Sequence, residues 1–357
     1  MSMLYLISNA KKTIREGGMA RNKAFEDELR RRNAKIFTYT SMNFYYRVFV
    51  FIKTLFFLVF IKKSTVVILQ NTFITYIFPL PFFKYNLMIK FIEKVLKSTS
   101  KKNIVYFEVN DLIYEQSIDL KLEVNPNSLI YENFIFNLPN IKFIFASHKM
   151  RDYVVEKYNI EYKNAQVILN GAPEILKIDE LEKTNDLQNE KPIKFIYVGT
   201  LNKGREIEKL IEVFENQHHE LYLMGQDGNW INLYEKKNVV YLGSFGEYEA
   251  LLKTSQFDIG VIPYNLAFYY NLCYPTKNSF YLSAGLPILS TPLEETKNVI
   301  NNLANSIAIF AEMKEWKPLI RDLDRSTVIS MKKNVNQIKQ KVYWGTILSH
   351  LKLEMFS

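Results

Sequence analysis

Two glycines and two basic residues separate a predicted strand from a predicted helix at positions 197–214 (YVGTLNKGREIEKLIEVF). Gly199 and Gly204 have no side chain, so a ligand can approach the backbone closely at these positions. Lys203 and Arg205 stand at the start of the helix, where the positive end of the helix dipole attracts anions. A diphosphate bound here would gain both effects and two charge-assisted hydrogen bonds. The alternative is a strand–helix turn with solvated basic residues.

A second segment, YPTKNSFYLSAGLPILSTP at positions 274–292, has similar chemistry. Pro275 makes its entry rigid, and Lys277 opens a predicted helix. Gly285 is placed to end that helix, and Pro287 precedes a strand. A cation at the start of a second helix again suits an anionic ligand, provided that both segments face one cleft.

Several familiar motifs are absent. The sequence has no G-x-G-x-x-G after its first strand, no P-loop, no H-E-x-x-H and no G-x-S-x-G, which weighs against common NAD enzymes, P-loop kinases and serine hydrolases. No Asp-x-Asp motif stands out, and a single cysteine excludes a zinc site built on several thiolates. His218 and His219 have no partnering carboxylate nearby, so we interpret them as part of a surface turn.

The elements that must position these residues alternate between strand and helix, which predicts parallel sheets with helical crossovers. Predicted strands cover 4–8, 35–39, 66–69, 103–108, 141–146, 166–169, 193–198, 221–224, 239–242, 259–262 and 288–290. Predicted helices cover 19–32, 44–62, 85–97, 148–158, 206–214, 247–253, 277–283 and 335–355. The expected fold class is α/β, with two doubly wound, Rossmann-like domains facing a cleft at the carboxyl ends of their strands.

A charged stretch bounded by Gly171 and Pro192 interrupts the alternation. We therefore expect an N-terminal domain at 1–170, a linker at 171–192 and a second domain at 193–335. Residues 336–357 would form a C-terminal helix. The length of 357 residues agrees with two domains, because single cores stop growing beyond ~250–300 residues.

Charge is distributed unevenly along the chain. The net charge is +9, but residues 1–170 carry 25 basic against 14 acidic residues, and the remainder carries 21 against 23. No acidic residue occurs in the segment 29–92, which holds ten basic residues and many aromatic ones. Such a surface attracts polyanions, either an anionic membrane or a nucleic acid. Nucleic acid is disfavoured because the basic residues are not concentrated on one helix and no binding signature is present.

An apolar run at 48–61 (VFVFIKTLFFLVFI) favours the membrane alternative. It is shorter than the ~20 residues of a spanning helix, but Arg47, Lys62 and Lys63 flank it. It could lie in the headgroup interface with its lysines near lipid phosphates. The alternative is a buried helix with solvated basic flanks. The N-terminus does not have the pattern of a signal peptide, and Cys273 is the single cysteine, so the expected location is cytoplasmic, on the inner face of the cell membrane.

Four segments in order resemble the donor domain of GT-B glycosyltransferases of the group-one type. VGTLNKGR with its helix resembles the opening of that domain, and ELYLMGQDG (220–228) resembles its next strand and glycine turn. NVVYLGSFGEYEALLKTSQFDIGVIPY (238–264) resembles the stretch that follows, and PTKNSFYLSAGLPILST resembles the P-x-K-x-x-E-Y-x-x-x-G-x-P signature. The N-terminal half resembles the family more weakly, through the Gly17-Gly18 loop and Asn110-Asp111.

The resemblance implies that the second domain holds a nucleotide diphosphate sugar and that the first holds the acceptor. The residues that would contact the donor are Gly199, Thr200, Lys203, Arg205, Gly225, Lys277 and Ser279, with Gly17 and Gly18 near the acceptor or the donor phosphate. Two positions depart from the family pattern: Thr200 replaces an arginine, and Phe280 replaces the glutamate of the signature. These departures put the ribose contact in doubt.

A base for the acceptor hydroxyl would come from the first domain. The candidates are Asp111 and His148, then Glu108 and Glu115. The resemblance implies leaving-group stabilisation by cations and helix ends, with no metal and no other cofactor. The expected function is sugar transfer to a lipid-linked glycan in surface polysaccharide assembly. Two alternatives are a non-catalytic GT-B-like subunit of a complex and a GT-B sugar-nucleotide epimerase.

Overall fold

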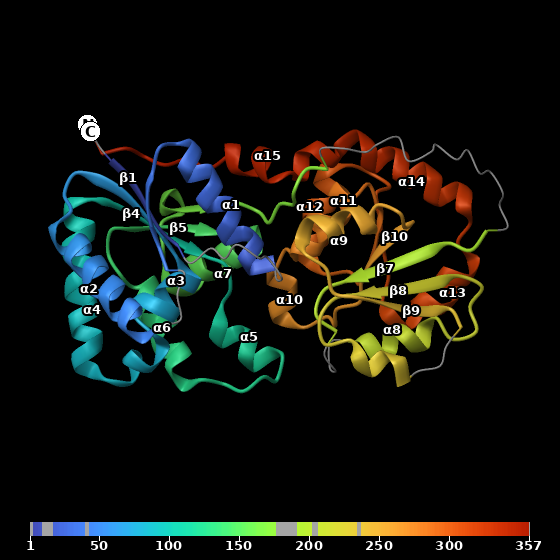
Figure 1. Ribbon diagram of the computed structural model, residues 1–357, viewed down its shortest axis with the longest axis horizontal. Coiled ribbons are helices and arrows are strands. Elements are labelled where there is room, and N and C mark those ends of the chain that lie inside the picture. The colour runs from blue at the N-terminus through green and yellow to red at the C-terminus, as the bar shows by residue number, and fades with distance from the viewer. Residues whose placement is uncertain are drawn as a thin grey trace.

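The protein has two lobes, each built on a six-stranded parallel sheet with helices on both faces (Figure 1). The computed structural model describes residues 3–8, 17–39, 43–175, 191–201, 206–233 and 237–356. The two-domain α/β fold expected from the sequence is confirmed.

The N-terminal sheet has the strand order β2-β1-β3-β4-β5-β6. Its strands are β1 (Met3–Ser8), β2 (Lys35–Thr38), β3 (Ser64–Leu69), β4 (Ile104–Val109), β5 (Ile141–Phe145) and β6 (Ala165–Val167). Its helices are α1 (Gly17–Arg31), α2 (Phe44–Phe60), α3 (Gln70–Thr72), α4 (Asn86–Lys102), α5 (Ile113–Asp119), α6 (Pro126–Phe136) and α7 (His148–Tyr158). The strand order reverses between β1 and β3, so this pair is the switch point of the sheet.

Apolar cores cover both faces of this sheet. Val67 packs in the core on the side of α1, and the next residue, Ile68, packs in the core on the side of α2 and α4. Consecutive strand residues point to opposite faces, so a strand buried on both sides is apolar throughout. This is why VVIL at 66–69 predicted a strand without showing any alternation of polar and apolar residues.

The C-terminal sheet has the order β12-β11-β10-β7-β8-β9, with its switch point between β7 and β10. Its strands are β7 (Lys194–Val198), β8 (Glu220–Met224), β9 (Val239–Gly243), β10 (Ile259–Ile262), β11 (Ile288–Ser290) and β12 (Ala308–Phe310). Its helices are α8 (Ile207–Val213), α9 (Glu247–Thr254), α10 (Phe268–Leu272), α11 (Thr276–Ser283), α12 (Glu294–Leu303), α13 (Trp316–Asp322) and α14 (Arg325–Ile338). Strand β12 was not predicted, because its three residues are only half-buried at the sheet edge.

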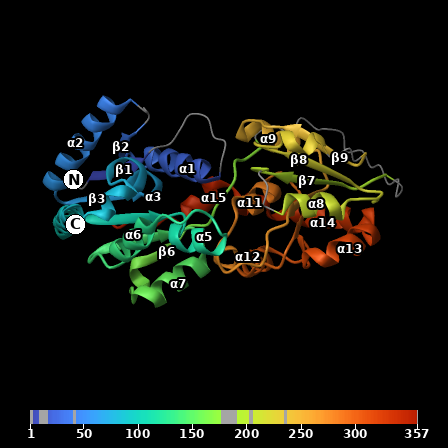
Figure 2. The same ribbon diagram turned by 90° about the horizontal axis from the view of Figure 1, so that it is seen from below.

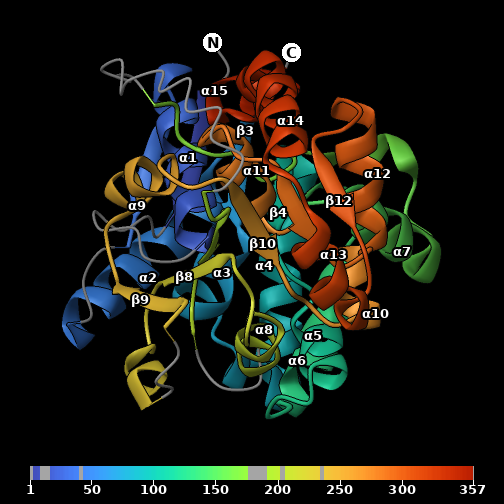
Figure 3. The same cartoon turned by 90° about the vertical axis from the view of Figure 1, so that its right-hand side faces the viewer.

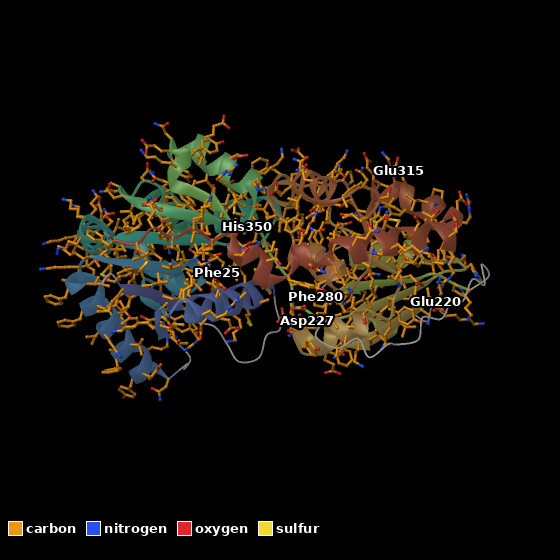
Figure 4. The ribbon with its side chains drawn as sticks, turned by 90° about the horizontal axis from the view of Figure 1, so that it is seen from above. Phe25, Glu220, Asp227, Phe280, Glu315 and His350 are labelled. Carbon is orange, nitrogen blue, oxygen red and sulfur yellow. The ribbon has the colours of Figure 1, made fainter. Side chains whose placement is uncertain are left out.

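The end of the chain differs from the single helix predicted at 335–355. Helix α14 ends at Ile338, a 3-10 turn covers Lys339–Val342, and a short helix α15 (Trp344–Ser349) follows. Residues 350–356 then run over the N-terminal lobe, as Figure 4 shows for His350. The 3-10 turn and the β-region backbone of Tyr343 break the helix and redirect the chain between the lobes.

A short helix of the C-terminal lobe also reaches the other lobe. Helix α10 places Tyr269 and Leu272 in the N-terminal apolar core. The hydroxyl of Ser147 donates to the carbonyl of Leu272 at 2.5 Å, which fixes the end of α10 to the start of α7. The two lobes are therefore joined by α10 and by the C-terminal segment. Figure 1 shows α10 and α15 near the lobe boundary, and Figure 2 shows α15 there from a second direction.

Candidate active site

A cleft of about 1030 Å³ separates the lobes. Its lining comes from loops that directly follow strands in both sheets, including Asn110 after β4, Ala146 after β5, Gly199 after β7 and Gly225 after β8. Figure 4 shows the direction of β8: Glu220, its first residue, lies far from the N-terminal lobe, and Asp227, just beyond its end, lies at the lobe boundary. Ligands of open α/β sheets bind at such carboxyl ends.

Two glycines form the floor of the cleft beside the switch point of the C-terminal sheet. Gly199 has φ +144° and Gly225 has φ +151°, backbone conformations that residues other than glycine rarely adopt. A Cβ on Gly225 would lie 1.7 Å from the carbonyl oxygen of Gly199, and a Cβ on Gly199 would lie 2.6 Å from the Lys277 Nζ. The ends of β7 and β8 therefore touch through backbone alone.

Lys277 holds its ammonium group over this floor. Its Nζ donates to the Tyr264 hydroxyl at 2.9 Å and lies 5.1 Å from the ring centre of Tyr197 and 5.3 Å from that of Tyr264. The aromatic rings hold the cation in place while it faces the cleft. A fixed cation above exposed backbone at the start of α11 is suited to a phosphate-bearing ligand.

The other predicted donor contacts have different positions. Thr200 lines the cleft and its carbonyl accepts from the Tyr197 hydroxyl at 3.3 Å. Lys203 and Arg205 lie outside the described residues. Ser279 is fully buried and donates to the carbonyl of Asn170 at 2.6 Å. It therefore connects α11 to the interdomain segment and does not line the cleft, in contrast to the prediction.

Asp111 is the predicted base that lines the cleft. Its carboxylate accepts from the Tyr269 hydroxyl at 2.5 Å and from the Asn110 amide at 2.7 Å. Burial raises the pKa of Asp111, although the hydrogen bond from Tyr269 and the positive charge of Arg21 oppose this effect. A carboxylate with a raised pKa at the end of a strand can act as a general base.

Two other carboxylates proposed from the sequence are used in ion pairs. Glu108 is fully buried and its Oε1 lies 2.5 Å from the Nε of Arg21, which is also fully buried. Burial raises the pKa of Glu108, and the guanidinium of Arg21 opposes this effect. Glu115 accepts from Tyr153 at 2.6 Å and pairs with Lys157 at 2.5 Å. Neither is part of the cleft lining.

His148 lies at a contact between the lobes instead of in the cleft lining. Its ring Nδ1 is 3.0 Å from the carboxylate of Glu295, which belongs to α12. The backbone N–H groups of His148 and Lys149 also donate to that carboxylate, at 2.7 and 3.2 Å. Glu295 thus caps the start of α7 from the other lobe, and His148 takes part in this contact.

Gly17 and Gly18 begin α1. Gly18 lines the cleft, and a Cβ at this position would lie 3.4 Å from the Asn110 amide nitrogen. Residues 9–16, which precede them, lie outside the described residues.

Sequence reasoning missed the aromatic residues of the segment 264–274. Tyr264 orients Lys277, and Tyr269 bonds to Asp111 from the opposite lobe. Asp119 accepts the backbone N–H of Tyr269 at 2.7 Å. The signal was the density of tyrosines in YNLAFYYNLCY directly before the signature segment. Among the described residues, no group of three or more His, Cys, Asp or Glu side chains is arranged to hold a metal ion.

Comparisons with known proteins agree with this architecture. Residues 195–355 match a family described as Glucosyltransferase 3-like, C-terminal domain. A search of curated proteins finds no significant match. Among solved structures, a sucrose-phosphate synthase from Thermosynechococcus elongatus superimposes with a TM-score of 0.64 at 11% identity, covering 97% of this chain and 96% of the other.

Two further structures are similar over nearly their whole length. WaaG, a glycosyltransferase involved in lipopolysaccharide biosynthesis, has a TM-score of 0.60 at 10% identity and coverage of 97% and 99%. HepE from Anabaena, solved in complex with UDP-glucose, has a TM-score of 0.60 at 11% identity and coverage of 97% of each chain.

The two sheets, the switch-point cleft and these likenesses define a GT-B glycosyltransferase fold, so the resemblance predicted from the sequence is confirmed. Within that fold, residues 195–355 match the model of the Glucosyltransferase 3-like, C-terminal domain family.

Proposed function

We propose that the protein transfers a sugar from a nucleotide diphosphate sugar to the hydroxyl of a glycan acceptor, without a metal ion. The observation that carries the proposal is the Lys277 ammonium held over the Gly199 backbone at the switch point. This site suits the diphosphate, whose negative charge grows as the bond to the sugar breaks. The acceptor oxygen attacks the anomeric carbon, the diphosphate leaves with the bonding electrons, and Asp111, which lines the cleft, takes the hydroxyl proton.

Calorimetric titration with UDP, GDP, ADP and their sugars tests the donor. We expect one nucleotide series to bind wild-type protein and the Lys277→Ala variant to lose about 10- to 100-fold in affinity, as for a charged hydrogen-bond partner. Lys297→Ala is the control, because it removes an exposed cation from the same lobe outside the cleft lining. Absence of binding to all nucleotides would contradict the proposal and favour a non-catalytic subunit.

Helix α2 presents an exposed apolar surface, which bears on where the acceptor is located. Tyr45, Phe49, Ile52, Phe56 and Phe60 recur every three or four residues and are 47–82% exposed, so they form one outward stripe. The opposite side of α2, with Val50 and Leu58, is buried in the lobe. Helix α4 packs beside α2 and adds Leu87, which is 83% exposed.

We propose that this stripe docks on an anionic lipid surface on the cytoplasmic side of a membrane. Exposed lysines within and just after the helix, Lys53, Lys62 and Lys63, complement lipid phosphates, and the segment 29–92 has no acidic residue to oppose them. No described helix is long and apolar enough to cross a bilayer, so the docking would be interfacial. The acceptor would then be a lipid-linked glycan in surface polysaccharide assembly.

Vesicle flotation tests the docking. Wild-type protein should float with phosphatidylcholine vesicles that contain phosphatidylglycerol, less with phosphatidylcholine alone, and less at high salt. The double variant Phe49→Ser/Phe56→Ser should remain in the soluble fraction. Tyr162→Ser, which removes an exposed aromatic residue elsewhere on the lobe, should float like wild type. Recovery of wild type in the soluble fraction under every condition would refute docking.

A further inference from the structure

Glu247 is a cleft-lining carboxylate with no assigned role. It is the first residue of α9, which follows β9, and it faces the cleft together with Ala250, one helical turn later. No described residue makes a hydrogen bond or ion pair with its side chain. Burial raises the pKa of Glu247 to about 7. A partly buried acceptor with no partner among the described residues has hydrogen-bonding capacity for a ligand.

The position of Glu247 in the sheet separates it from the diphosphate site. The strand order runs β10-β7-β8-β9, so the end of β9 lies two strands away from the end of β7. Two strand spacings of ~4.8 Å amount to about 10 Å. This distance is comparable to the distance between the diphosphate of a bound nucleotide and its nucleoside. A carboxylate would repel a phosphate, whereas it can accept hydrogen bonds from two neighbouring hydroxyl groups.

Two carboxylates line the described part of the cleft on the C-terminal lobe, and Glu247 is the one with no hydrogen bond or ion pair to a described residue. The second carboxylate there is Glu206, which pairs with Lys209 at 2.5 Å. Phe245 and Phe280 line the cleft as apolar surfaces. Figure 4 shows Phe280 at the edge of the lobe that faces the cleft. Its helix, α11, packs against α9, so position 280 and position 247 lie on neighbouring helices of one wall, and only position 247 carries an acceptor.

We infer that Glu247 binds the ribose hydroxyl groups of the donor nucleotide, taking the role that the glutamate replaced by Phe280 would have. This inference rests on the proposed function, because it requires a nucleotide in the cleft. The carboxylate accepts the two hydroxyl groups, and the aromatic side chains at 245 and 280 provide the apolar wall beside the nucleoside.

Paired ribo- and deoxynucleotides test the assignment. The affinities of wild type, Glu247→Gln and Glu247→Ala are measured by calorimetry for UDP and 2′-deoxy-UDP, or for the matching pair of whichever base binds wild type. We expect wild type to prefer the ribonucleotide by about 10- to 100-fold, which is the effect of a hydrogen bond to a charged group. Glu247→Ala should bind both forms with nearly equal affinity, and Glu247→Gln should retain a partial preference.

The control is Glu249→Gln, which neutralises an exposed carboxylate on the same helix and should keep the wild-type preference. Because the preference is a ratio within one protein, a general loss of stability does not imitate the expected result. A wild-type preference that survives unchanged in Glu247→Ala would overturn the assignment while leaving the donor site intact. Wild type that binds no nucleotide would instead contradict the proposed function.

Discussion

The backbone contact between Gly199 and Gly225 makes the cleft floor sensitive to a single methyl group. The nearest atom to a Cβ at position 225 is a backbone oxygen, which cannot rotate away as a flexible side chain could. Positive φ at both glycines adds a backbone penalty for any other residue. The chain therefore requires glycine here for both steric and conformational reasons.

Gly225→Ala should lower the free energy of unfolding by about 2 kcal/mol or more and abolish nucleotide binding. Gly345→Ala is the control, because a Cβ at that position meets no atom within 4 Å. Chemical denaturation of the two variants measures the difference. Equal stability of Gly225→Ala and wild type would contradict the described contact.

The sequence alone did not show which of several neighbouring residues line the cleft. Lys277 and Ser279 are two positions apart on α11, so they point to different sides of the helix, at ~100° per residue. Lys277 and Phe280 are three apart and share the cleft-facing side. Types and spacing predicted that Gly199, Gly225 and Lys277 belong to the site, but the direction of Ser279 and the pairing of His148 with Glu295 depend on tertiary contacts.

Among the elements, the strands could be predicted from their apolar runs. Short, wholly apolar segments such as VVIL and IGVI are typical of strands that are buried on both faces of a sheet. Helix α2 was predicted at nearly its observed bounds, but the sequence left open whether it would be buried or exposed. In the structure one side of α2 is buried and the other side carries an exposed, mainly aromatic stripe. Helix α10 was not predicted, because five residues are too few to show a helical repeat of apolar positions. The residues that it packs against lie in the other lobe.

Helix α6 carries a buried carboxylate that couples stability to pH. Glu132 is 1% exposed, and burial raises its pKa to about 7. The ordinary value is 4.5, so the folded protein retains a proton that the unfolded chain loses between pH 4.5 and 7. This group therefore makes stability fall as pH rises through that window, and its full cost applies above pH 7.

Glu132→Gln should raise the Tm relative to wild type at pH 8 by more than at pH 5. The neutral amide removes the cost of ionisation, which has a ceiling of about 3 kcal/mol at ~1.4 kcal/mol per pKa unit. Its oxygen can still accept from the Tyr114 N–H, now at 2.8 Å from the carboxylate. Glu123→Gln, at an exposed position, should show no such pH dependence. A Tm difference for Glu132→Gln that is the same at both pH values would contradict this account.

In the molecule as a whole, the C-terminal segment fastens one lobe to the other. Figure 3 shows α14 and α15 at the top of the view, near the C-terminus. Arg32 donates to the carbonyls of Leu351 and Leu348 at 2.8 and 3.1 Å. The hydroxyl of Thr65 donates to the carbonyl of Glu354 at 2.7 Å. Leu348 and Leu351 are buried beside Phe25 of α1. This segment lies within the matched range 195–355, so it completes the N-terminal core from the other domain's sequence.

Leu351→Ala should cost about 2–5 kcal/mol of stability, as for other large-to-small core changes. It should also increase cleavage by trypsin at Lys352. Met355→Ala is the matched control, because Met355 is 49% exposed on the same segment. Thermal melting and timed proteolysis measure both effects. Identical behaviour of the two variants would show that the segment does not fasten the lobes.

The proposed function requires a nucleotide diphosphate sugar to lie across the cleft, with its diphosphate against Gly199 and Lys277. A crystal structure of the protein with the nucleotide sugar that binds most tightly in titration tests this most directly. We expect diphosphate density within hydrogen-bond distance of the Lys277 Nζ and the sugar directed toward Asp111. Density for the nucleotide at any other surface, with the cleft filled by solvent, would contradict it.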